Sequence, residues 1–351
     1  MTENTPRTET LMSKEAHEAP TRCAEQLRLN SDLVRDAGAR LRELAPPFAA
    51  TLARGSSDQA AAFGKFLLEI YGHTPTLSHA PSTGSLYHAT SPNFRNVPLI
   101  AISQSGKSPD LLAAAEEAGA KGALIIAIVN DANSPLAELA DIVIPVYAGP
   151  ENSVAATKSF VCTLIALMHL VAEWSQDGAL LAALGQVEEV LTKAANTDWT
   201  GVTDMLTSAG DMFVLGRGPT LAIAGEAALK LKETCGLHAE AFSSAEFAHG
   251  PMTLVGEGDP VLALAPLDEA STGLNERLED FAARGAKVIA AGRAQDVSSA
   301  ECTLPTATDC HPALGAIAQI QSFYALANAV SLARGHNPDS PPHLNKVTRT
   351  L

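Results

Sequence analysis

The sequence predicts an α/β fold made of two tandem copies of one unit, each a three-layer αβα sandwich around a mostly parallel five-stranded sheet of the flavodoxin-like type. Three observations lead to this prediction. Short, wholly apolar segments alternate with longer segments of helical periodicity, the pattern of a parallel sheet covered by helices. The order of strand, glycine-containing turn and helix occurs twice, at 48–71 and 211–234. The length of 351 residues, 46% of them hydrophobic, suits two domains with ample cores.

The first copy is read from its apolar segments. We expect its strands at 48–53, 74–79, 97–102, 123–129 and 142–146. Helices follow the first strand at 59–71 and the third at 109–119, and the apolar run 153–174 is expected to be one long helix over a sheet face. Residues 1 to about 30 are polar and are expected to begin as a disordered tail, with a lead-in helix over 24–44.

The second copy repeats this layout after a helical connector at 180–206. We expect strands at 211–215, 261–265, 287–291 and 302–304, and helices at 222–234 and 313–334. The proline-rich segment 335–346 excludes regular helix and central strand. The predicted organisation is an N-terminal tail and lead-in helix at 1–44, a first domain at 45–178, a connector at 179–207, a second domain at 208–335, and a tail over the active site at 336–351.

Composition excludes several classes of function. A formal net charge of -15 disfavours nucleic acids and anionic membranes as partners. The N-terminus has no apolar signal region and no run is long enough to cross a membrane, so we expect a cytoplasmic protein. The five cysteines are scattered and never in a CxxC spacing, which indicates neither a disulfide framework nor a zinc site, and we expect no metal: Cys23, Cys162, Cys235, Cys302 and Cys310.

The turn after the third strand, residues 103–108 (Ser-Gln-Ser-Gly-Lys-Ser, hereafter the serine turn), is a candidate phosphate site. Its serines offer hydroxyl groups, and Gly106 allows the sharp turn that lets N–H groups at the helix start converge on an anion. An acidic protein needs such local groups, because its overall field repels an anion. The alternative is that Ser108 is only a helix N-cap. The second copy has Pro-Leu-Asp at 266–268 instead, so only the first copy carries the full turn.

Three charged residues of the 222–234 helix share one face. Glu226, Lys230 and Glu233 are spaced i, i+4 and i+7, which brings a carboxylate, an ammonium group and a second carboxylate into contact. An exposed ladder of salt bridges is one interpretation. The apolar residues between the charges favour partial burial instead, and a partly buried carboxylate beside a lysine suits acid–base chemistry.

Several motifs together resemble the sugar isomerase (SIS) domain pair that forms the isomerase half of the glucosamine-6-phosphate synthases. They are Ala-Arg-Gly-Ser-Ser at 53–57, the serine turn, the segment from Glu240 through His249-Gly250-Pro251, and the C-terminal tail. The resemblance covers about residues 45–351 and implies two tandem SIS domains. We expect no counterpart of the glutaminase domain of the synthases in this chain, since position 2 is not cysteine and about 45 residues are too few for such a domain. Glutamine is therefore not expected to be the nitrogen donor within this chain.

The resemblance places substrate contacts in the first domain. The phosphate pocket that it implies consists of Ser57, Ser103, Gln104, Ser105 and Ser108, the last of which replaces a threonine usual in the synthases. Near the sugar it implies Glu151 and the Val154 backbone. Ala156 stands where the synthases have a serine, which leaves the sugar contacts open there.

The resemblance places the chemistry in the second domain, in a neighbouring subunit and in the tail. It implies that Glu233 moves the proton, while Lys230 sets the charge state and position of that carboxylate. It implies that His249 opens the sugar ring in the site of a neighbouring subunit, which requires a homodimer; Ala248 replaces a lysine usual before this histidine. Lys346 falls at the Schiff-base lysine of the synthases, where it acts as a nucleophile or neutralises charge. Taken alone, His249 reads as structural and Lys346 as a surface charge.

These features predict an SIS-type glucosamine-6-phosphate deaminase that forms fructose 6-phosphate and ammonia without a metal or organic cofactor. A fructosamine-6-phosphate deglycase, or an isomerase of another amino sugar phosphate such as galactosamine 6-phosphate, is the alternative within the same class. A non-catalytic phosphosugar sensor is the alternative of another class. A sensor of the regulator type would carry a DNA-binding helix-turn-helix and a basic patch, and the sequence offers neither.

Overall fold

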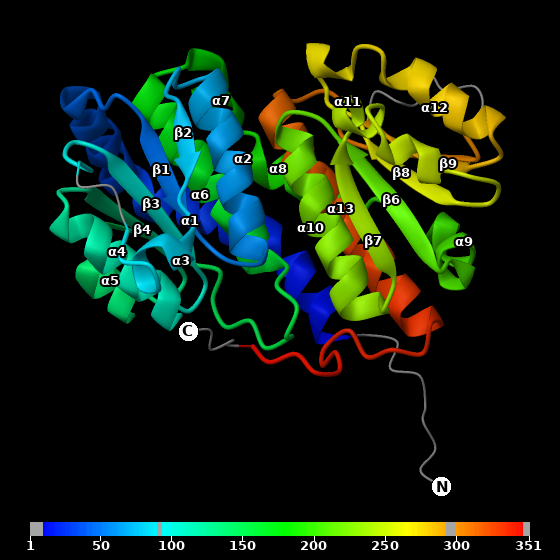
Figure 1. Cartoon of the computed structure of the whole chain (residues 1–351), viewed down its shortest axis with the longest axis horizontal. Helices are drawn as coiled ribbons and strands as arrows, with labels where there is room; N and C mark the ends of the chain where they lie inside the picture. Colours follow the sequence, from blue (N-terminus) through cyan, green and yellow to red (C-terminus); the bar gives the residue numbers. More distant parts are fainter. Residues whose placement is uncertain (1–9, 90–92, 293–299, 347–351) are drawn as a thin grey trace, which may run out of the picture.

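The computed structural model describes residues 10–89, 93–292 and 300–346. It contains two five-stranded sheets with the strand orders β2-β1-β3-β4-β5 and β10-β9-β8-β6-β7. Every pair of neighbouring strands in both sheets is parallel. The two sheets lie side by side, each with helices on both faces (Figure 1). The predicted fold class, two tandem αβα units around parallel sheets, is therefore confirmed.

The first sheet and its helices alternate along the chain as the apolar pattern predicts. In order they are α1 (Leu11–Leu44), β1 (Ala49–Leu52), α2 (Ser56–Ile70), β2 (Thr76–Ser78), α3 (Pro81–Ser85), β3 (Pro98–Ser103), α4 (Pro109–Ala120), β4 (Leu124–Val129), α5 (Pro135–Leu139), β5 (Ile142–Pro145) and α6 (Lys158–Ser175). The connector that follows is helical, as predicted: α7 (Gly178–Leu184), α8 (Val187–Ala195), the 3₁₀ turn η1 (Thr200–Val202) and α9 (Thr203–Ser208).

The second sheet is built in the same way. Its elements are β6 (Asp211–Gly216), α10 (Pro219–Cys235), β7 (His238–Ser243), α11 (Ser244–Phe247), η2 (Pro251–Leu254), β8 (Pro260–Leu264), η3 (Glu269–Ser271), α12 (Leu274–Ala283), β9 (Lys287–Ala291), β10 (Cys302–Leu304) and α13 (Pro312–Ala333). The described part of the tail, 336–346, forms neither helix nor strand, as its prolines predict.

One hydrophobic core runs through both domains. It is formed by α1, α2, α6, α10 and α13 together with one face of each sheet. Side chains alternate along each strand, so that Ile100 and Ile102 of β3 enter this shared core, whereas Leu99 and Ala101 pack against α4 on the other face. The outer face of the second sheet packs against α12 and Phe247. Because both faces are covered, the central strands are apolar throughout.

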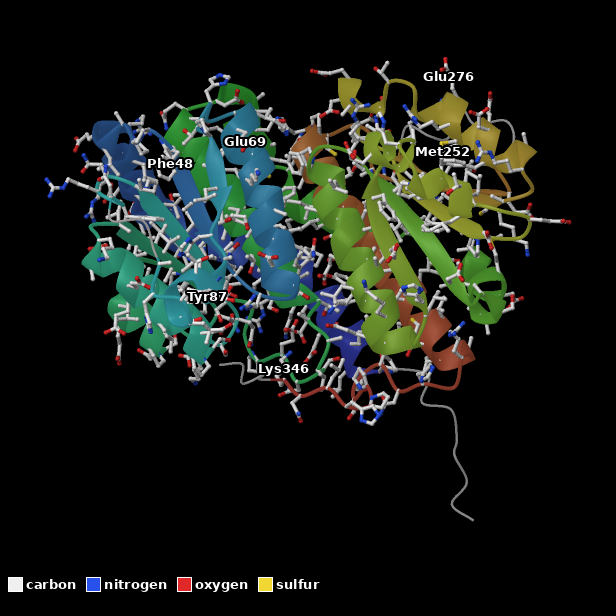
Figure 2. All side chains as sticks on the ribbon, viewed as in Figure 1. Phe48, Glu69, Tyr87, Met252, Glu276 and Lys346 are labelled. Carbon is white, nitrogen blue, oxygen red and sulfur yellow. The ribbon has the colours of Figure 1, made fainter. Side chains whose placement is uncertain are left out.

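The two sheets point in opposite directions relative to the tail. Phe48, directly before β1, lies at the upper edge of the first sheet, and Lys346 lies below its lower edge (Figure 2). The carboxyl ends of β1 and its parallel neighbours therefore face the tail. Met252, which follows β7 and α11, lies at the upper edge of the second sheet (Figure 2). Helix α10 runs back from that upper edge, so the C-terminal half of α10 reaches the end of the molecule where the tail lies.

Helix α1 begins at Leu11, so the lead-in helix expected at 24–44 is present but longer, and residues 11–23, expected to belong to the tail, are helical. Its polar N-terminal half buries a narrow stripe that includes Met12, Ala19 and Cys23. Pro20 lies inside the helix and cannot donate a hydrogen bond to the Ala16 carbonyl. Gln321 Nε2 of α13 donates to that carbonyl instead, at 2.9 Å, so a tertiary contact makes the proline tolerable.

Two further boundaries differ from expectation. Helix α6 begins at Lys158 and not at 153, because residues 151–157 form a loop whose backbone N–H groups donate to the side chains of Glu15 and Glu151. Strand β7, His238–Ser243, has no apolar run that would predict it, since it lies at the edge of its sheet and most of its residues are only partly buried. Among the helices of the described residues, none has the length and apolar character needed to cross a membrane.

Candidate active site

The serine turn joins β3 to α4 at the carboxyl edge of the first sheet. Ser103 is buried, and its Oγ accepts a hydrogen bond of 3.0 Å from the Gly106 N–H. Gly106 has a φ of +62°, and a Cβ there would lie 2.1 Å from Ser134 Oγ, so the position requires glycine. Ser105 Oγ accepts from the Lys107 N–H at 3.4 Å. Ser108 is the N-cap residue of α4, but its hydroxyl makes no capping hydrogen bond, so capping does not explain why a serine stands there.

The neighbouring turn at the start of α2 adds further polar groups. Gln104 and Ser57 line one small cavity with Ser56 and Ser159, and its volume of about 30 Å³ holds little more than a water molecule. The two cations beside the turns are paired with carboxylates: Arg54 with Asp110 at 2.8 Å, and Lys107 with Asp131 at 3.0 Å. An anion here would thus rely on hydroxyl groups, N–H groups and the start of α2 and α4.

The second copy has the same backbone turn but different chemistry. Gly218 before α10 has φ 57° and ψ -138°, close to the φ 57° and ψ -133° of Gly55 before α2. Pro219 then removes one N–H group, and the Thr220 hydroxyl is bonded to the backbone of Arg217 at 3.0 Å. The start of α10 therefore lacks the free N–H and hydroxyl groups on which the anion site predicted for the first copy depends.

The charged face of α10 is buried in the structure. The exposed fractions of the side chains are 0% for Glu226, 1% for Lys230 and 25% for Glu233. Lys230 Nζ lies 3.7 Å from Glu226 Oε1 and forms a short ion pair with Glu233. The three residues are in contact as their spacing predicts, and the alternative of an exposed salt-bridge ladder is wrong because α10 packs on α2 and α13.

Burial and the neighbouring charges shift the pKa values of Glu226 and Lys230, and so decide which of them carries a charge. Burial raises the pKa of Glu226 to about 7, and the Glu233 carboxylate adds to this, while Lys230 and the Ser56 hydroxyl oppose it. Burial alone would lower the pKa of Lys230, but the two carboxylates outweigh it and raise that pKa. Lys230 is therefore a fixed cation, and Glu226 is a sealed carboxyl group that can hold a proton near neutral pH.

Of the two carboxylates on this face of α10, Glu233 is the one that is partly exposed. It lines a cavity of about 310 Å³ whose other walls are Lys232, Gly236 and three tail residues: His336, Pro342 and Leu344. That volume is at the lower end of the range for small-molecule sites. A carboxylate with partial access, held beside a buried ammonium group, is suited to accept and return a proton.

Glu151 organises the loop between β5 and α6. Its Oε1 accepts from the Thr157 and Ser159 N–H groups at 3.0 and 3.1 Å, and its Oε2 accepts from the Ser159 hydroxyl at 2.6 Å. Lys346 Nζ donates to the same Oε2 at 3.1 Å and to the Ser153 carbonyl at 2.6 Å. Burial would raise the pKa of Glu151, but Lys346 and the other donors outweigh it and lower that pKa. Glu151 is thus an ionised anchor for Lys346.

The resemblance places the Val154 backbone near the sugar, but the Val154 N–H group is already bonded in the structure. Its N–H donates to the Asp339 carbonyl of the tail at 3.1 Å, which leaves the Val154 carbonyl as the group with a role still to assign. Ala156 lines the small cavity beside Gln104, so the methyl group at this position faces the same space as the serine hydroxyls.

His249 lies apart from these groups. It is exposed between α11 and η2, where its N–H donates to the Glu246 carbonyl at 2.9 Å. Met252, three residues later, lies at the upper edge of the second domain, and Lys346 lies at the opposite end of the molecule (Figure 2). Within one chain Lys346 contacts Glu151, and the Glu151 and Glu233 carboxylates both act on the Lys230 ammonium group. Gln104 of the serine turn lines a cavity with Ser159, which donates to Glu151. His249 lies outside this group.

Sequence reasoning missed Tyr324 of α13. Its side chain is buried, and its hydroxyl has no hydrogen-bond partner among the described residues. Burial and the carboxylates of Glu226, Glu151 and Glu233 raise its pKa well above the usual value, so the phenol stays neutral beside the cluster. In the sequence it is one apolar-looking position of a long helix, and nothing local marks it. No group of three or more His, Cys, Asp and Glu side chains in 10–89, 93–292 and 300–346 is arranged to hold a metal ion.

Comparison with known proteins gives a consistent result. The model of the SIS domain family matches residues 49–173 and 205–330. Glutamine--fructose-6-phosphate aminotransferase [isomerizing] of Pyrococcus horikoshii is 33% identical over 303 residues, which cover 83% of this chain and 50% of that protein. The chain thus spans about half the length of the curated relatives that it matches.

Solved structures share the whole fold. A Silicibacter pomeroyi protein, provisionally described as a phosphosugar isomerase, superimposes with a TM-score of 0.89 at 41% identity and covers 94% of this chain and 100% of its own. Glucosamine-6-phosphate deaminase of Thermotoga maritima superimposes with a TM-score of 0.78 at 20% identity, over 97% of this chain and 100% of its own. At that identity the second match shows the fold alone.

Proposed function

This chain belongs to the SIS domain family, and from that premise we propose that it is a phosphosugar isomerase that converts glucosamine 6-phosphate and water to fructose 6-phosphate and ammonia. One observation carries the proposal. The buried Lys230 holds Glu233 on the wall of a cavity that tail residues also line, and the serine turn follows β3 at the sheet edge that faces the tail. A phosphate anchor and a proton-transferring carboxylate at one site are what an aldose–ketose conversion of a sugar phosphate requires.

The serine turn would hold the phosphate group and so fix the position of the open-chain sugar. Ser57, Gln104 and the hydroxyls of the serine turn donate hydrogen bonds, and the starts of α2 and α4 add their positive dipole ends. In this proposal each of these groups contacts the phosphate, and C1 and C2 lie several bonds away. Orientation of the reacting carbons against Glu233 is the main contribution of this anchor.

Glu233 would move the proton. The carboxylate takes the proton from C2 of the open-chain amino sugar, the electron pair of that C–H bond forms a C1=C2 double bond, and the C1 aldehyde oxygen takes up a proton. Return of a proton to C1 places the double bond between C2 and nitrogen. Water then adds to this imine and ammonia leaves, so the only co-reactant is water. Lys230 holds Glu233 in place at the start of the cycle through their ion pair.

Lys346 has two roles compatible with its surroundings. As observed it donates to Glu151 and to the Ser153 carbonyl, the contacts of an ammonium group that neutralises charge beside the sugar. A role as nucleophile toward a keto sugar requires that it first release both contacts and a proton. The proposal includes a second subunit, because His249 lies between α11 and η2 at the upper edge of the second domain, whereas Glu233 lines a cavity walled by the tail at the opposite end.

The test is direct. Purified protein incubated with glucosamine 6-phosphate is expected to release ammonia and fructose 6-phosphate in equal amounts, and a panel with galactosamine 6-phosphate and fructosamine 6-phosphates measures its preference. Glu233→Gln keeps the size of the side chain and is expected to lower kcat by about 10²- to 10⁴-fold. Glu276→Gln, on α12 at the far edge of the second domain, is the matched control (Figure 2). No product at high enzyme concentration rules out the proposed reaction, and full activity of Glu233→Gln rules out the assigned base.

A further inference from the structure

Asp339 joins three parts of the molecule that are far apart in the sequence. We propose that Asp339 is a positioning residue that fixes the tail, and with it Lys346 and the loop 151–157, on the first turn of α1. The inference rests on the proposed function only in treating Lys346 and this loop as parts of the active site. Asp339 is 9% exposed, and its side-chain and main-chain oxygens all bind other segments.

The carboxylate of Asp339 completes the start of α1. Its Oδ2 accepts from the Leu11 N–H at 2.9 Å and its Oδ1 from the Met12 N–H at 2.8 Å. The next N–H, of Ser13, is bound by the Thr10 hydroxyl at 3.0 Å. Helix α1 has no acidic residue in its own first turn. The tail therefore supplies both the missing acceptors and the negative charge that the start of a helix favours.

The first turn of α1 is itself held in place by hydrogen bonds to α13. The Thr10 hydroxyl donates to Asn328 Oδ1 of α13 at 2.5 Å, and further along α1 Gln321 Nε2 of α13 donates to the Ala16 carbonyl at 2.9 Å. Helix α13 belongs to the core shared by both domains. A tail residue that binds this turn is therefore held at a fixed position relative to both domains.

Asp339 also holds the loop 151–157. Its carbonyl accepts from the Val154 N–H at 3.1 Å. On the other side, Glu15 of α1 accepts from the N–H groups of Asn152 and Ser153 at 2.5 and 3.1 Å. The loop is thus bound by α1 directly, through Glu15, and indirectly, through the tail.

The tail is attached again seven residues later. Lys346 donates to Glu151 and to the Ser153 carbonyl, at the two ends of the same short stretch of loop. Asp339 and Lys346 therefore fix both ends of the stretch 339–346, and the prolines between them limit how far the backbone can rearrange. Loss of the Asp339 contacts should free Lys346 as well as Val154.

Substitutions at two residues break the contact from opposite sides. Asp339→Ala removes the acceptor, and Asp339→Asn keeps its shape but loses the charge. Leu11→Pro removes the N–H donor of an exposed residue at the first helical position, where proline is well tolerated. The matched controls lie at the start of α7, far from the tail (Figure 1): Asp177→Asn removes a carboxylate that caps Leu180, and Gly178→Pro places a proline at the first helical position.

Two measurements report on the tail without requiring turnover. The first is amide hydrogen exchange at Val154, and the second is acylation of Lys346 by a pulse of acetic anhydride, quantified against the exposed Lys121. We expect Asp339→Ala to raise both rates about tenfold or more, since a charge-assisted contact is lost. Leu11→Pro should raise both by a smaller factor, and Asp339→Asn should lie between Asp339→Ala and wild type. With glucosamine 6-phosphate, kcat should fall more than KM rises, because the phosphate anchor is untouched.

The opposite results overturn the proposal. If Asp339→Ala folds and leaves the Val154 exchange and Lys346 acylation at wild-type rates, Asp339 does not position the tail. If Leu11→Pro leaves both rates unchanged, Asp339 does not act through α1. If the two α7 controls raise the rates as much as the tail variants do, the effect is general destabilisation. Since none of these readouts depends on turnover, a failure of the deaminase assignment would be seen separately, as absence of product in wild type.

Discussion

Glu226 shows how burial changes the protonation of a single carboxyl group, because burial raises its pKa to about 7. Its side chain has no exposed surface, and neither carboxylate oxygen has a well-aligned hydrogen bond among the described residues. The ammonium group of Lys230, 3.7 Å away, is its counter-charge. The i, i+4, i+7 spacing predicted contact among the charges of α10. It did not predict that the group most deeply buried would be Glu226, because that depends on how α10 packs on α2 and α13.

The pH dependence of stability should report on Glu226. Its pKa rises from 4.5 in the unfolded chain to about 7 in the fold, so between these values the folded protein holds a proton that the unfolded chain has released. The free energy of unfolding therefore falls as pH rises through this window, by up to about 3 kcal/mol.

Glu226→Gln removes this titration. The free energy of unfolding of wild type minus that of Glu226→Gln should decrease from pH 5 to pH 8, as measured by urea denaturation at both pH values. A difference that is constant or grows with pH would show that Glu226 is ionised throughout.

Gly106 is the residue on which the serine turn depends. Gly106→Ala would place a Cβ 2.1 Å from Ser134 Oγ at a φ of +62°, so the turn must change shape. We expect the affinity for glucosamine 6-phosphate, measured by calorimetry, to weaken about tenfold or more. Gly218→Ala is the matched control. Gly218 has a φ of +57° and open space around it, so alanine there introduces backbone strain at a position outside the serine turn. It should lower thermal stability and leave affinity unchanged. Equal loss of affinity in both variants would contradict a specific role of the serine turn.

At the scale of elements, hydrogen bonds between helix ends hold the second domain together. Arg334, directly after α13, donates to carbonyls at the C-terminal ends of two other helices. They are Leu206 and Thr207 of α9, Ala209 just beyond it, and Cys235 of α10, at 2.8 to 3.2 Å. These carbonyls have no partner within their own helices. One side chain thus sets where three helices end relative to one another, including the end of α10 that carries Glu233.

Arg334→Ala should destabilise the protein by about 2 to 3 kcal/mol, because several carbonyls lose their donor at once. Arg334→Lys should recover only part of this, since an ammonium group cannot span the acceptors of a planar guanidinium group. Arg35→Ala, which removes an exposed pair with Asp32, should cost no more than about 1 kcal/mol. Urea denaturation followed by the fluorescence of the two buried tryptophans measures all three. An Arg334→Ala midpoint equal to that of Arg35→Ala would contradict the role of Arg334.

Elements were predictable where one local pattern dominates. The central strands are apolar on both faces and were expected within two residues of where they lie, as β4 at Leu124–Val129 illustrates. Strand β7 was missed because an edge strand need not be apolar, and α1 was predicted too short because tertiary partners stabilise its polar half. The start of α6 was placed too early because the apolar run continues into a loop that Glu151 and Glu15 hold open.

At the scale of the whole molecule, the two repeats have unequal roles because their sheets point in opposite directions relative to the tail (Figure 1). The carboxyl edge of the first sheet contributes the serine turn, whereas the second domain contributes the returning end of α10. Residues that follow the strands of the second sheet, His249 among them, lie at the other end of the molecule. A role for His249 in the proposed reaction therefore needs a second copy of the chain.

Complementation between inactive variants tests this arrangement. We expect Glu233→Gln and His249→Asn each to be strongly impaired alone. When the two are co-expressed in equal amounts, half of the dimers should contain one of each, with one complete site of two, so activity should recover to about a quarter of wild type. If His249 served its own chain, no mixed dimer would contain a complete site and activity would not recover. A monomeric wild-type protein in sedimentation would also contradict the proposal.

The sequence by itself determined the repeated α/β unit, the buried strands, the serine turn and the contact among Glu226, Lys230 and Glu233, because each follows from periodicity or spacing within a few turns of chain. The tertiary structure alone decided which end of each sheet faces the tail, that Tyr324 lies beside the carboxylates, and that Asp339 completes the start of α1 from 328 residues away. These three features depend on contacts between residues far apart in the sequence. Shape, burial and unsatisfied backbone groups decide which residues come into contact, and no local sequence pattern predicts them.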